Sequence, residues 1–352
     1  FLVVSCPCAL VVSVPLSFFG GIGGASRKGI LIKGGNYMDA LAHIDTVVLD
    51  KTGTLTQGTF AVEAIHPDEL SEKELLHLAA HVEHFSHHPI AVALQGAYQH
   101  VGDGCTTNHV HEVVGKGIVA DVNGHRVAVG NERMMEAEGA TLHPCKRCEG
   151  HAGTVVHVAI DGRYAGHVVI SDQVKVDASE ALRALRQLGV KQTVMLTGDK
   201  EAVARQVAQQ VGIDSYAAEL LPADKVDRVE RLIQQQSQEK GTLAFVGDGI
   251  NDAPVLARAD VGIAMGAMGS DAAIDAADVV LMDDKPSKIA EAICIARRTI
   301  ANARQNVIFA IVVKALVLLL ASVGVATMGM AVFADVGVMV LCVLNSMRTL
   351  RV

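Results

Sequence analysis

One stretch, residues 46–56 (Thr-Val-Val-Leu-Asp-Lys-Thr-Gly-Thr-Leu-Thr), constrains the fold of this chain more than any other. Its short apolar run is typical of a buried parallel strand, and it ends in Asp50 and a turn rich in Gly and Thr. Ligands of open α/β sheets bind beyond the carboxyl ends of the strands. Asp50 therefore stands where a carboxylate can attack a phosphoryl group. The alternative for Asp50 alone is a capping residue at a strand-to-loop junction.

Composition limits the class of protein. The 352 residues are long enough for two or three soluble units, and the apolar residues concentrate at the two ends. A net charge of -8 argues against a nucleic-acid partner. Seven cysteines without regular spacing favour a reducing cytosol over a secreted disulfide framework. Because the chain starts inside an apolar run without Met, we expect it to be truncated.

Residues 1–34 predict a transmembrane helix followed by a cytosolic linker. Proline in Cys6-Pro-Cys8 breaks the helical hydrogen-bond ladder, and irregular backbone at membrane depth is tolerated where it is buried or lines a cavity. The thiols of Cys6 and Cys8 then offer ligands for Cu(I), Zn(II) or Cd(II), although a kink with incidental cysteines is the alternative. Positive charges beyond the span mark its cytosolic end: Arg27, Lys28 and Lys33.

Two patterns alternate in the middle of the chain. Residues 61–168 predict an inserted α+β domain with an antiparallel sheet, with elements over 69–84, 90–98, 110–114, 117–122, 126–129, 154–160 and 165–170. Residues 35–60 and 169–300 alternate strands and helices, which predicts one doubly wound parallel sheet. Its later elements are expected over 178–188, 193–196, 202–211, 223–235, 242–246, 261–265 and 279–281.

Three of these strands end in polar groups, namely Asp50, Thr197 and Asp248, which are expected to meet at one sheet edge. Asp50 can attack the phosphoryl group, and Thr197 can donate a hydrogen bond to one of its oxygens. Asp248 can hold Mg²⁺, which prefers carboxylate and water oxygens. Lys225 can neutralise the phosphoryl charge, while Asn251 and Asp252 orient the phosphate and Lys225. Each motif alone is also an ordinary turn; their order on alternating strands indicates a site.

These residues carry a resemblance to a known family. Asp50-Lys-Thr-Gly-Thr54, Thr197-Gly-Asp199 and Gly247-Asp-Gly-Ile-Asn-Asp252 resemble the signature set of P-type ATPases, which belong to the haloacid-dehalogenase superfamily. Cys6-Pro-Cys8 and Ser86-His-His88-Pro89 narrow the resemblance to the heavy-metal-transporting branch. The resemblance implies a haloacid-dehalogenase-like phosphorylation domain, α/β and doubly wound, with an inserted α+β nucleotide-binding domain. Transmembrane helices are implied at both ends.

The resemblance also implies residue roles. Asp50 is expected to be autophosphorylated, and Asp50, Thr52 and Asp248 are expected to bind Mg²⁺. Thr52 stands where related phosphatases carry a second, proton-transferring Asp, so the aspartyl phosphate is expected to persist. Because no Thr-Gly-Glu motif is found, the actuator domain and earlier membrane helices are expected to be missing. The positions that match the ATP contacts of the family are Glu83, His88, Gly115, Gly117 and Asn131.

The C-terminal end, residues 301–352, predicts two transmembrane helices, over 306–325 and 330–347. Each contains a charge, Lys314 and Asp335, and such groups at membrane depth are costly and usually functional. The alternatives are snorkelling for Lys314 and a position near the outer surface for Asp335. Arginines before and after the pair place both ends in the cytosol.

In the family, an intramembrane Lys followed by Asp-x-Gly is typical of the zinc/cadmium/lead subgroup. Lys314 and Asp335-Val-Gly337 resemble that pattern. Thiolates with a carboxylate also suit Zn(II) or Cd(II) better than Cu(I). The hypothesis is that Cys6, Cys8 and Asp335 bind the transported ion, with Lys314 as a countercharge. A candidate accessory zinc site, with an exposed polar loop as the alternative, comprises His143, Cys145, Cys148 and His151.

The predicted function is ATP-driven export of Zn²⁺, Cd²⁺ or Pb²⁺ across the cytoplasmic membrane through an aspartyl-phosphate intermediate. The expected protein is a monomeric, multi-pass P-type ATPase in the lipid bilayer, with cytosolic catalytic domains, ATP and Mg²⁺ as cofactors and no nucleic-acid partner. Two alternatives remain open from the sequence. One is a membrane-anchored phosphatase of the haloacid-dehalogenase type, and the other is a copper-exporting P-type ATPase.

Overall fold

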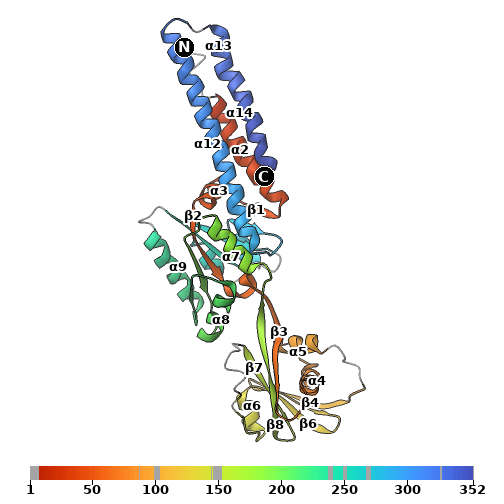
Figure 1. Cartoon of the computed structure of the whole chain (residues 1–352). Helices are drawn as coiled ribbons and strands as arrows, with labels where there is room; N and C mark the ends of the chain where they lie inside the picture. The colour runs from red at the N-terminus through yellow and green to blue at the C-terminus, as the bar shows by residue number, and fades with distance from the viewer. Residues whose placement is uncertain are drawn as a thin grey trace. The chain divides into compact units, whose positions relative to one another are not determined.

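The computed structural model describes residues 8–86, 88–98, 104–143, 145, 153–236, 241–248, 252–266, 271–325 and 327–351 (Figure 1). The chain divides into two compact units, one formed by Phe1–Leu55 with Lys175–Val352 and the other by Thr56–Val174. The inserted unit is longer at both ends than the expected 61–168. The reason is that β3 (Thr56–Pro67) and β8 (Arg163–Val174) pair antiparallel as far as Thr56 opposite Val174.

The first unit contains a seven-stranded sheet whose central strands are almost fully buried. In sheet order its strands are β1 (Ile30–Ile32), β13 (Val279–Leu281), β12 (Val261–Met265), β11 (Thr242–Gly247), β2 (Ile44–Asp50), β9 (Gln192–Leu196) and β10 (Ser215–Ala217). All neighbours are parallel except β1, which runs antiparallel to β13. The expected doubly wound fold is confirmed, with an antiparallel edge strand that the sequence analysis did not foresee. In β1, Leu31 is exposed between two buried isoleucines, as suits an edge strand.

Helices cover this sheet because their apolar residues recur at helical spacing. They are α3 (Gly35–Ala42), α7 (Ala178–Gln187), α8 (Glu201–Val211), α9 (Pro222–Gln236), α10 (Ala253–Leu256) and α11 (Asp271–Ala276). In α7 the buried residues Ala178, Ala181, Leu182 and Leu185 form one stripe. Phe245 of β11, the largest fully buried side chain, packs in a cluster with Val229 and Leu232 of α9.

Strand register places the ends of the three central strands side by side. Asp50 of β2 lies opposite Leu196 of β9, so Thr197 follows directly beside it. On the other side, Leu49 lies opposite Val246 of β11, which brings Gly247 and Asp248 next to the end of β2. The sheet alone therefore brings the three polar strand ends together.

The second unit is an antiparallel six-stranded sheet with helices, in agreement with the expected α+β insertion. Its strand order is β3, β8, β7 (Thr154–Ile160), β6 (His125–Gly130), β5 (Gly117–Val122) and β4 (Thr107–Val113), and its helices are α4 (Glu72–Glu83), α5 (Pro89–Ala97) and α6 (Glu132–Ala137). Helix α4 begins with a capping box, in which Ser71 and Glu74 each accept from the other's backbone N–H. Its buried face, which includes Leu75 and Val82, packs on the sheet core.

Three stretches of the first unit are long and apolar enough to cross a membrane: Ala9–Arg27, Ser287–Ser322 and Met328–Arg351. They contain α2 (Cys8–Arg27), α12 (Ser287–Ser322), α13 (Met328–Val332), η4 (Phe333–Gly337), α14 (Val338–Ser346) and η5 (Met347–Arg351). Figure 1 shows α2 beside α12 and α14, and all three pairs are in contact. The expected span over 306–325 corresponds, as far as Ser322, to the second part of one continuous helix, α12, whose first part packs on α3 and α7.

Buried amide and hydroxyl groups join the three apolar helices. Asn306 of α12 donates to Ser346 Oγ of α14 over 2.8 Å, and Ser346 Oγ lies 2.9 Å from Ser17 Oγ of α2. Asn306 also donates to the Cys342 carbonyl over 3.2 Å. In hydrocarbon such groups must find partners within the protein, so this network fixes which faces of the helices meet.

Candidate active site

The site is centred on the end of β2 and the turn that follows it. Asp50 is 6% exposed, and the chain turns at Gly53, whose φ of 71° is favourable only for glycine. A Cβ at Gly53 would collide with the carboxylate of Asp248, which lies against the turn from the end of β11. Glycine is therefore needed here both for the backbone conformation and for the approach of Asp248.

Lys225 connects two of the acidic side chains. Its Nζ atom lies 2.6 Å from Asp50 Oδ1 and 2.9 Å from Asp252 Oδ1. Lys225 comes from the first part of α9, which begins at Pro222, and Asp252 stands immediately before α10. Both side chains are buried, as is Asp50. The predicted pairing of Asp252 with Lys225 is thus present in the geometry, and Lys225 also contacts Asp50, the expected nucleophile.

The site holds more negative charge than Lys225 balances. The pKa of Asp50 is raised to about 7, mainly by burial and secondly by the Asp252 carboxylate, although Lys225 lowers it. Burial and Asp252 also raise the pKa of Asp248 to about 6. For Lys225, burial disfavours the charge, but Asp50 and Asp252 outweigh it and raise its pKa. Asp50, Asp248 and Asp252 each offer an oxygen within 4.8 Å of the others, which fits a hard divalent cation such as Mg²⁺.

The other predicted residues of this site surround Asp50 in different ways. Thr197 is buried at the end of β9, and its Oγ1 accepts a hydrogen bond from Asp199 N over 3.1 Å. Thr52, two residues after Asp50, is exposed, while Lys51 between them is buried and ion-paired with Asp199. Asn251 lies outside the described residues.

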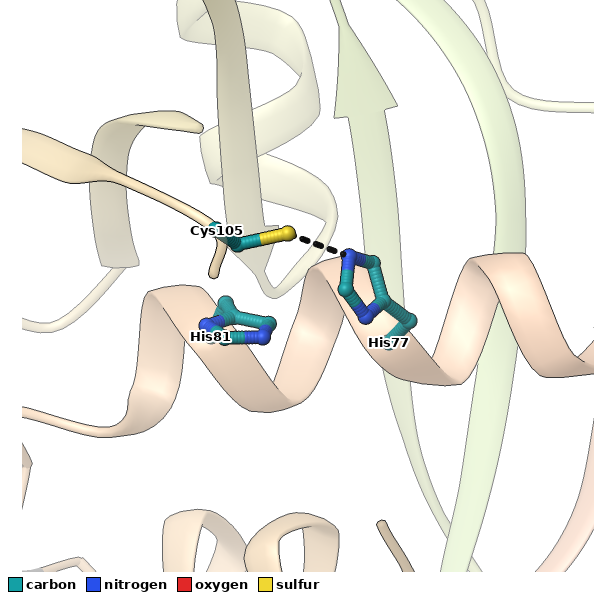
Figure 2. Close-up of side chains that lie close together, drawn as sticks. All are labelled: His77, His81 and Cys105. Atoms are coloured by element: carbon teal, nitrogen blue, oxygen red, sulfur yellow. Dashed lines mark hydrogen bonds between the residues drawn. The ribbon is translucent and has the colours of Figure 1, made fainter. Parts of the chain in front are cut away.

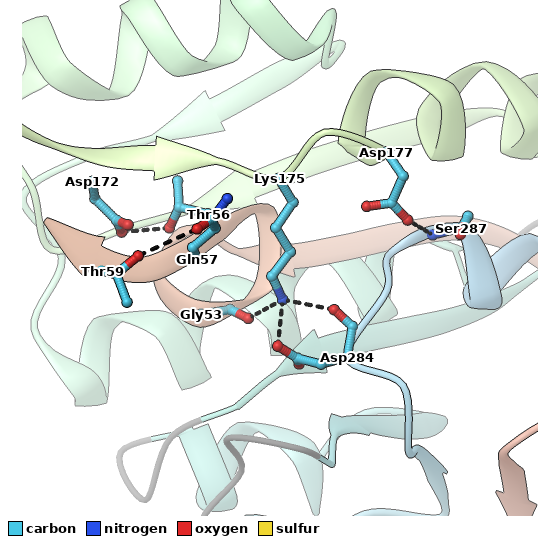
Figure 3. A network of polar contacts seen from close by, with 9 residues as sticks. All are labelled: Gly53, Thr56, Gln57, Thr59, Asp172, Lys175, Asp177, Asp284 and Ser287. Carbon is cyan, nitrogen blue, oxygen red and sulfur yellow. Dashed lines mark hydrogen bonds and ion pairs between the residues drawn. The ribbon is translucent and has the colours of Figure 1, made fainter. Parts of the chain in front are cut away.

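Lys175 is a site residue that the sequence analysis missed. Figure 3 shows its ammonium group donating to the Gly53 carbonyl (2.6 Å) and to the carbonyl and Oδ2 of Asp284 (both 3.0 Å). Nearby, Asp177 accepts from Ser287 N at the start of α12 (3.0 Å). Lys175 therefore ties the turn after Asp50 to the segment that leads into the long helix α12. A single lysine after a strand gave no sequence signal for this role.

Within the second unit, the structure brings together three of the five residues expected to contact ATP. Asn131 Nδ2 donates to the Gly115 carbonyl over 2.9 Å. Gly117 has a φ of 149°, and a Cβ there would collide with the Val129 carbonyl. His88 is exposed and caps α5, its Nδ1 accepting from Ile90 N over 3.3 Å. No hydrogen bond joins His88 to the other four in the described part of the unit.

Glu83, the fifth of these residues, is a buried acid on α4. The pKa of Glu83 is raised to about 7, mainly by burial and secondly by the charge of Glu112 on β4. Its ordinary value is 4.5, so folding favours the protonated form, and stability falls as the pH rises from about 4.5 to about 7. A group that costs stability at neutral pH is typical of a functional site.

We expect Glu83→Gln to stabilise the second unit more at pH 8 than at pH 5, by about 1–3 kcal/mol. The amide keeps the shape but removes a buried charge that the wild-type chain must carry above the raised pKa. Calorimetric unfolding of the chain at both pH values measures the effect. Glu72→Gln, an exposed position on the same helix, is the control. Equal gains at both pH values would contradict the raised pKa.

The apolar helices place the two predicted intramembrane charges together. Lys314 Nζ of α12 lies 3.6 Å from Asp335 Oδ1 of η4, and their side chains are only 16% and 13% exposed. Within the described residues neither atom has a hydrogen-bond partner. Asp335 sits in a π-helical turn, a feature frequent at functional sites. Lys314 is therefore paired with Asp335, as the countercharge hypothesis requires.

The predicted thiol ligands are described only in part. Cys8 begins α2, and the following Ala9 packs against Ala310 of α12 and Val338 of α14. Cys6 lies outside the described residues. Of the candidate accessory zinc site, His143 meets Tyr164 in an edge-to-face contact with ring centroids 6.0 Å apart, and Cys145 is half-buried. Cys148 and His151 lie outside the described residues, so this site stays a prediction.

Comparison with known proteins gives consistent results. The haloacid dehalogenase-like hydrolase family matches residues 44–260. The chain is 54% identical over 349 residues to a zinc-transporting ATPase of Synechocystis sp., covering 99% of this chain and 47% of that protein. It is 52% identical to a cadmium, zinc and cobalt-transporting ATPase of Bacillus subtilis, covering 100% of this chain and 49% of that protein. The chain thus spans about half the length of these relatives.

A solved structure is similar over nearly the whole chain. It is the crystal structure of a zinc-transporting PIB-type ATPase in the E2.Pi state, with a TM-score of 0.89 and 39% identity. The match covers 99% of this chain and 57% of that one. The resemblance inferred from the motifs is confirmed. By the family match and by these similarities, the chain belongs to the haloacid dehalogenase-like hydrolases and, among them, to the heavy-metal P-type ATPases.

Proposed function

We propose that this chain is the catalytic and ion-binding part of a pump that exports Zn²⁺, Cd²⁺ or Pb²⁺ from the cytosol at the expense of ATP. The observation that carries the proposal is the presence, in one unit, of a buried Asp50–Lys225 site and an intramembrane Lys314–Asp335 pair. A phosphatase needs only the first of these. The relatives named above, which transport zinc, cadmium or cobalt, support the same function.

The chemistry follows from the positions of the side chains. An Asp50 carboxylate oxygen attacks the γ-phosphorus of ATP, a new P–O bond forms, and ADP leaves with the electrons of the broken bond. Lys225 balances the charge of the transferred group, and Asp252 holds Lys225 in place. Thr197 donates a hydrogen bond to a phosphoryl oxygen. Mg²⁺, held by Asp50, Asp248 and Thr52, would neutralise the phosphate oxygens.

The resulting aspartyl phosphate is expected to last. Thr52 occupies the place of the acid that speeds hydrolysis in related phosphatases, and a hydroxyl does not transfer protons at neutral pH. A long-lived phosphoenzyme can store free energy for a conformational change. We also propose that the second unit binds ATP through Glu83, Gly115, Gly117 and Asn131, with His88 at the start of α5.

For the transported ion we propose Cys6, Cys8 and Asp335 as ligands. Two thiolates and a carboxylate suit a borderline divalent cation. Lys314 Nζ lies 3.6 Å from Asp335 Oδ1. Its positive charge balances the carboxylate when the ion leaves and disfavours rebinding of the ion. The pump would work as a monomer in the cytoplasmic membrane, with both soluble units in the cytosol.

The test uses the full-length protein in lipid vesicles, with ATP hydrolysis recorded against added Zn²⁺, Cd²⁺, Pb²⁺, Cu⁺ and Co²⁺. We expect stimulation by Zn²⁺, Cd²⁺ or Pb²⁺ and none in the Asp50→Asn blank. Asp335→Ala should lower the metal-stimulated rate by at least about tenfold, as expected for loss of a ligand. Stimulation by Cu⁺ alone would favour a copper pump, and steady hydrolysis without a metal response would favour a phosphatase.

A further inference from the structure

A second cluster of side chains that can bind a metal lies in the Thr56–Val174 unit, and none of its members belongs to a site described above. Helix α4 carries His77 and His81, which are four residues apart and so lie on one face. Cys105 approaches them from the segment before β4, as Figure 2 shows. Each of the three offers one ligand atom, and these atoms lie within 4.8 Å of one another. The sequence analysis missed the cluster, although the spacing of the two histidines was visible.

The geometry is close to that of a tetrahedral metal site. His77 Nε2 lies 3.3 Å from Cys105 Sγ, and the rings of His77 and His81 have centroids 4.6 Å apart. Zinc with Zn–N of about 2.0–2.1 Å and Zn–S of about 2.3 Å requires ligand atoms about 3.3–3.6 Å apart. The His77–Cys105 separation of 3.3 Å lies at the lower end of this range. The other pairs of ligand atoms lie within 4.8 Å.

Neighbouring side chains already hold two of the three ligands in a suitable orientation. Tyr98 Oη lies 2.8 Å from His77 Nδ1. In the tautomer that carries its proton on Nδ1, His77 donates to the phenol oxygen, and Nε2, which faces Cys105, is the nitrogen that binds the metal. Asn123 Nδ2 donates to Cys105 Sγ over 3.0 Å and so orients the sulfur. The Asn123 side chain also accepts from Thr106 N over 3.0 Å and so fixes the segment that carries Cys105.

We propose that His77, His81 and Cys105 form a binding site for one Zn²⁺ or a similar borderline cation such as Cd²⁺. Two imidazoles and one thiolate are the ligands such ions prefer, and a water would fill the fourth position. His81 is buried, while His77 and Cys105 are half-buried, so the cation can enter from solvent. Binding displaces the thiol proton of Cys105 and links α4 to the start of β4.

The test is a Co²⁺ titration of the purified 352-residue chain in detergent. Cys6→Ser and Cys8→Ser are present throughout, to remove the proposed thiol ligands of the transport site. We expect one equivalent of Co²⁺ to produce a thiolate-to-cobalt charge-transfer band, which Zn²⁺ abolishes by displacement. Cys105→Ser should remove the band, and His77→Ala or His81→Ala should weaken Co²⁺ binding by at least about tenfold. Tyr98→Phe should weaken it about 10–100-fold, since only the hydrogen bond is lost.

Matched controls separate this site from others. His84→Ala, at the end of the same helix, and Cys294→Ser, a cysteine of α12, should leave the band unchanged. Addition of Zn²⁺ should raise the unfolding temperature of the chain with Cys6→Ser and Cys8→Ser, but not that of the same chain with Cys105→Ser added. The unfolding transition of the latter also shows whether it folds. A band that survives Cys105→Ser, or that disappears in Cys145→Ser with Cys148→Ser, would overturn the proposal.

Discussion

Replacement of Asp50 by asparagine will abolish phosphorylation of the full-length protein by ATP. The amide has the shape of the carboxylate but no nucleophilic oxygen, and loss of a nucleophile lowers rates by a factor on the order of 10⁴–10⁶. Fold stability should not fall, because burial already raises the pKa of Asp50 to about 7 and the amide carries no charge. The measurement is incorporation of radiolabelled phosphate from ATP, with hydroxylamine to identify an acyl phosphate.

Asp45→Asn is the matched control for this experiment. Asp45 belongs to the same strand, β2, but pairs with the largely exposed Lys191. Phosphorylation of this variant should equal that of the wild-type protein. Hydroxylamine-sensitive phosphate in Asp50→Asn at the wild-type level would show that another residue is the nucleophile.

The acidic site was predictable from the sequence because short motifs and parallel topology determine it together. Asp50, Thr197 and Asp248 each follow a buried strand, and in a parallel sheet such ends meet at one edge. The register then places Leu196 opposite Asp50 without further information. Lys225 was predicted from its place at the start of a helix, but its contact with Asp50 Oδ1 could be measured only in the fold.

Residues that act across long sequence separations were not predictable in the same way. Lys175 contacts the Gly53 carbonyl from 122 positions away, and a lysine after a strand resembles any surface lysine. Cys105 meets His77 across 28 positions, through a loop whose path the sequence does not specify. Strand β1 is short, and only its pairing with β13 reveals it as the antiparallel edge.

The bounds of the membrane helices were also only partly predictable from the sequence. Hydropathy predicted a span over residues 306–325, but the helix begins at Ser287 and ends at Ser322. Ile289, Ile293 and Ala296 are buried in its first part, at helical spacing, so this stretch is an ordinary amphipathic helix of the soluble region. One helix therefore connects the segment held by Lys175 and Asp177 to Lys314, which the sequence treated as separate regions.

Lys225→Met will destabilise the first unit by about 3–5 kcal/mol, the cost of removing one partner from a buried ion pair. Lys225 is 9% exposed and contacts Asp50 and Asp252, which are themselves buried. Without the charge of Lys225, the neighbouring carboxylates of Asp50, Asp248 and Asp252 repel one another with no cation between them. Urea unfolding in detergent at pH 8, followed by hydrogen exchange of β2 and β11, measures the loss. Lys191→Met, which breaks the more exposed pair with Asp45, should cost less than about 1 kcal/mol.

Two further measurements identify charge as the cause rather than lost packing. The double variant Asp50→Asn with Lys225→Met should be more stable than Lys225→Met alone, because one uncompensated carboxylate is gone. Mg²⁺ should stabilise Lys225→Met more than the wild-type chain, since the cation replaces the missing positive charge and binds only the folded site. If neither Asp50→Asn nor Mg²⁺ restores stability, the role of Lys225 in the fold is the packing of its alkyl chain. In that case the pairing of Lys225 with Asp50 matters for phosphoryl transfer alone.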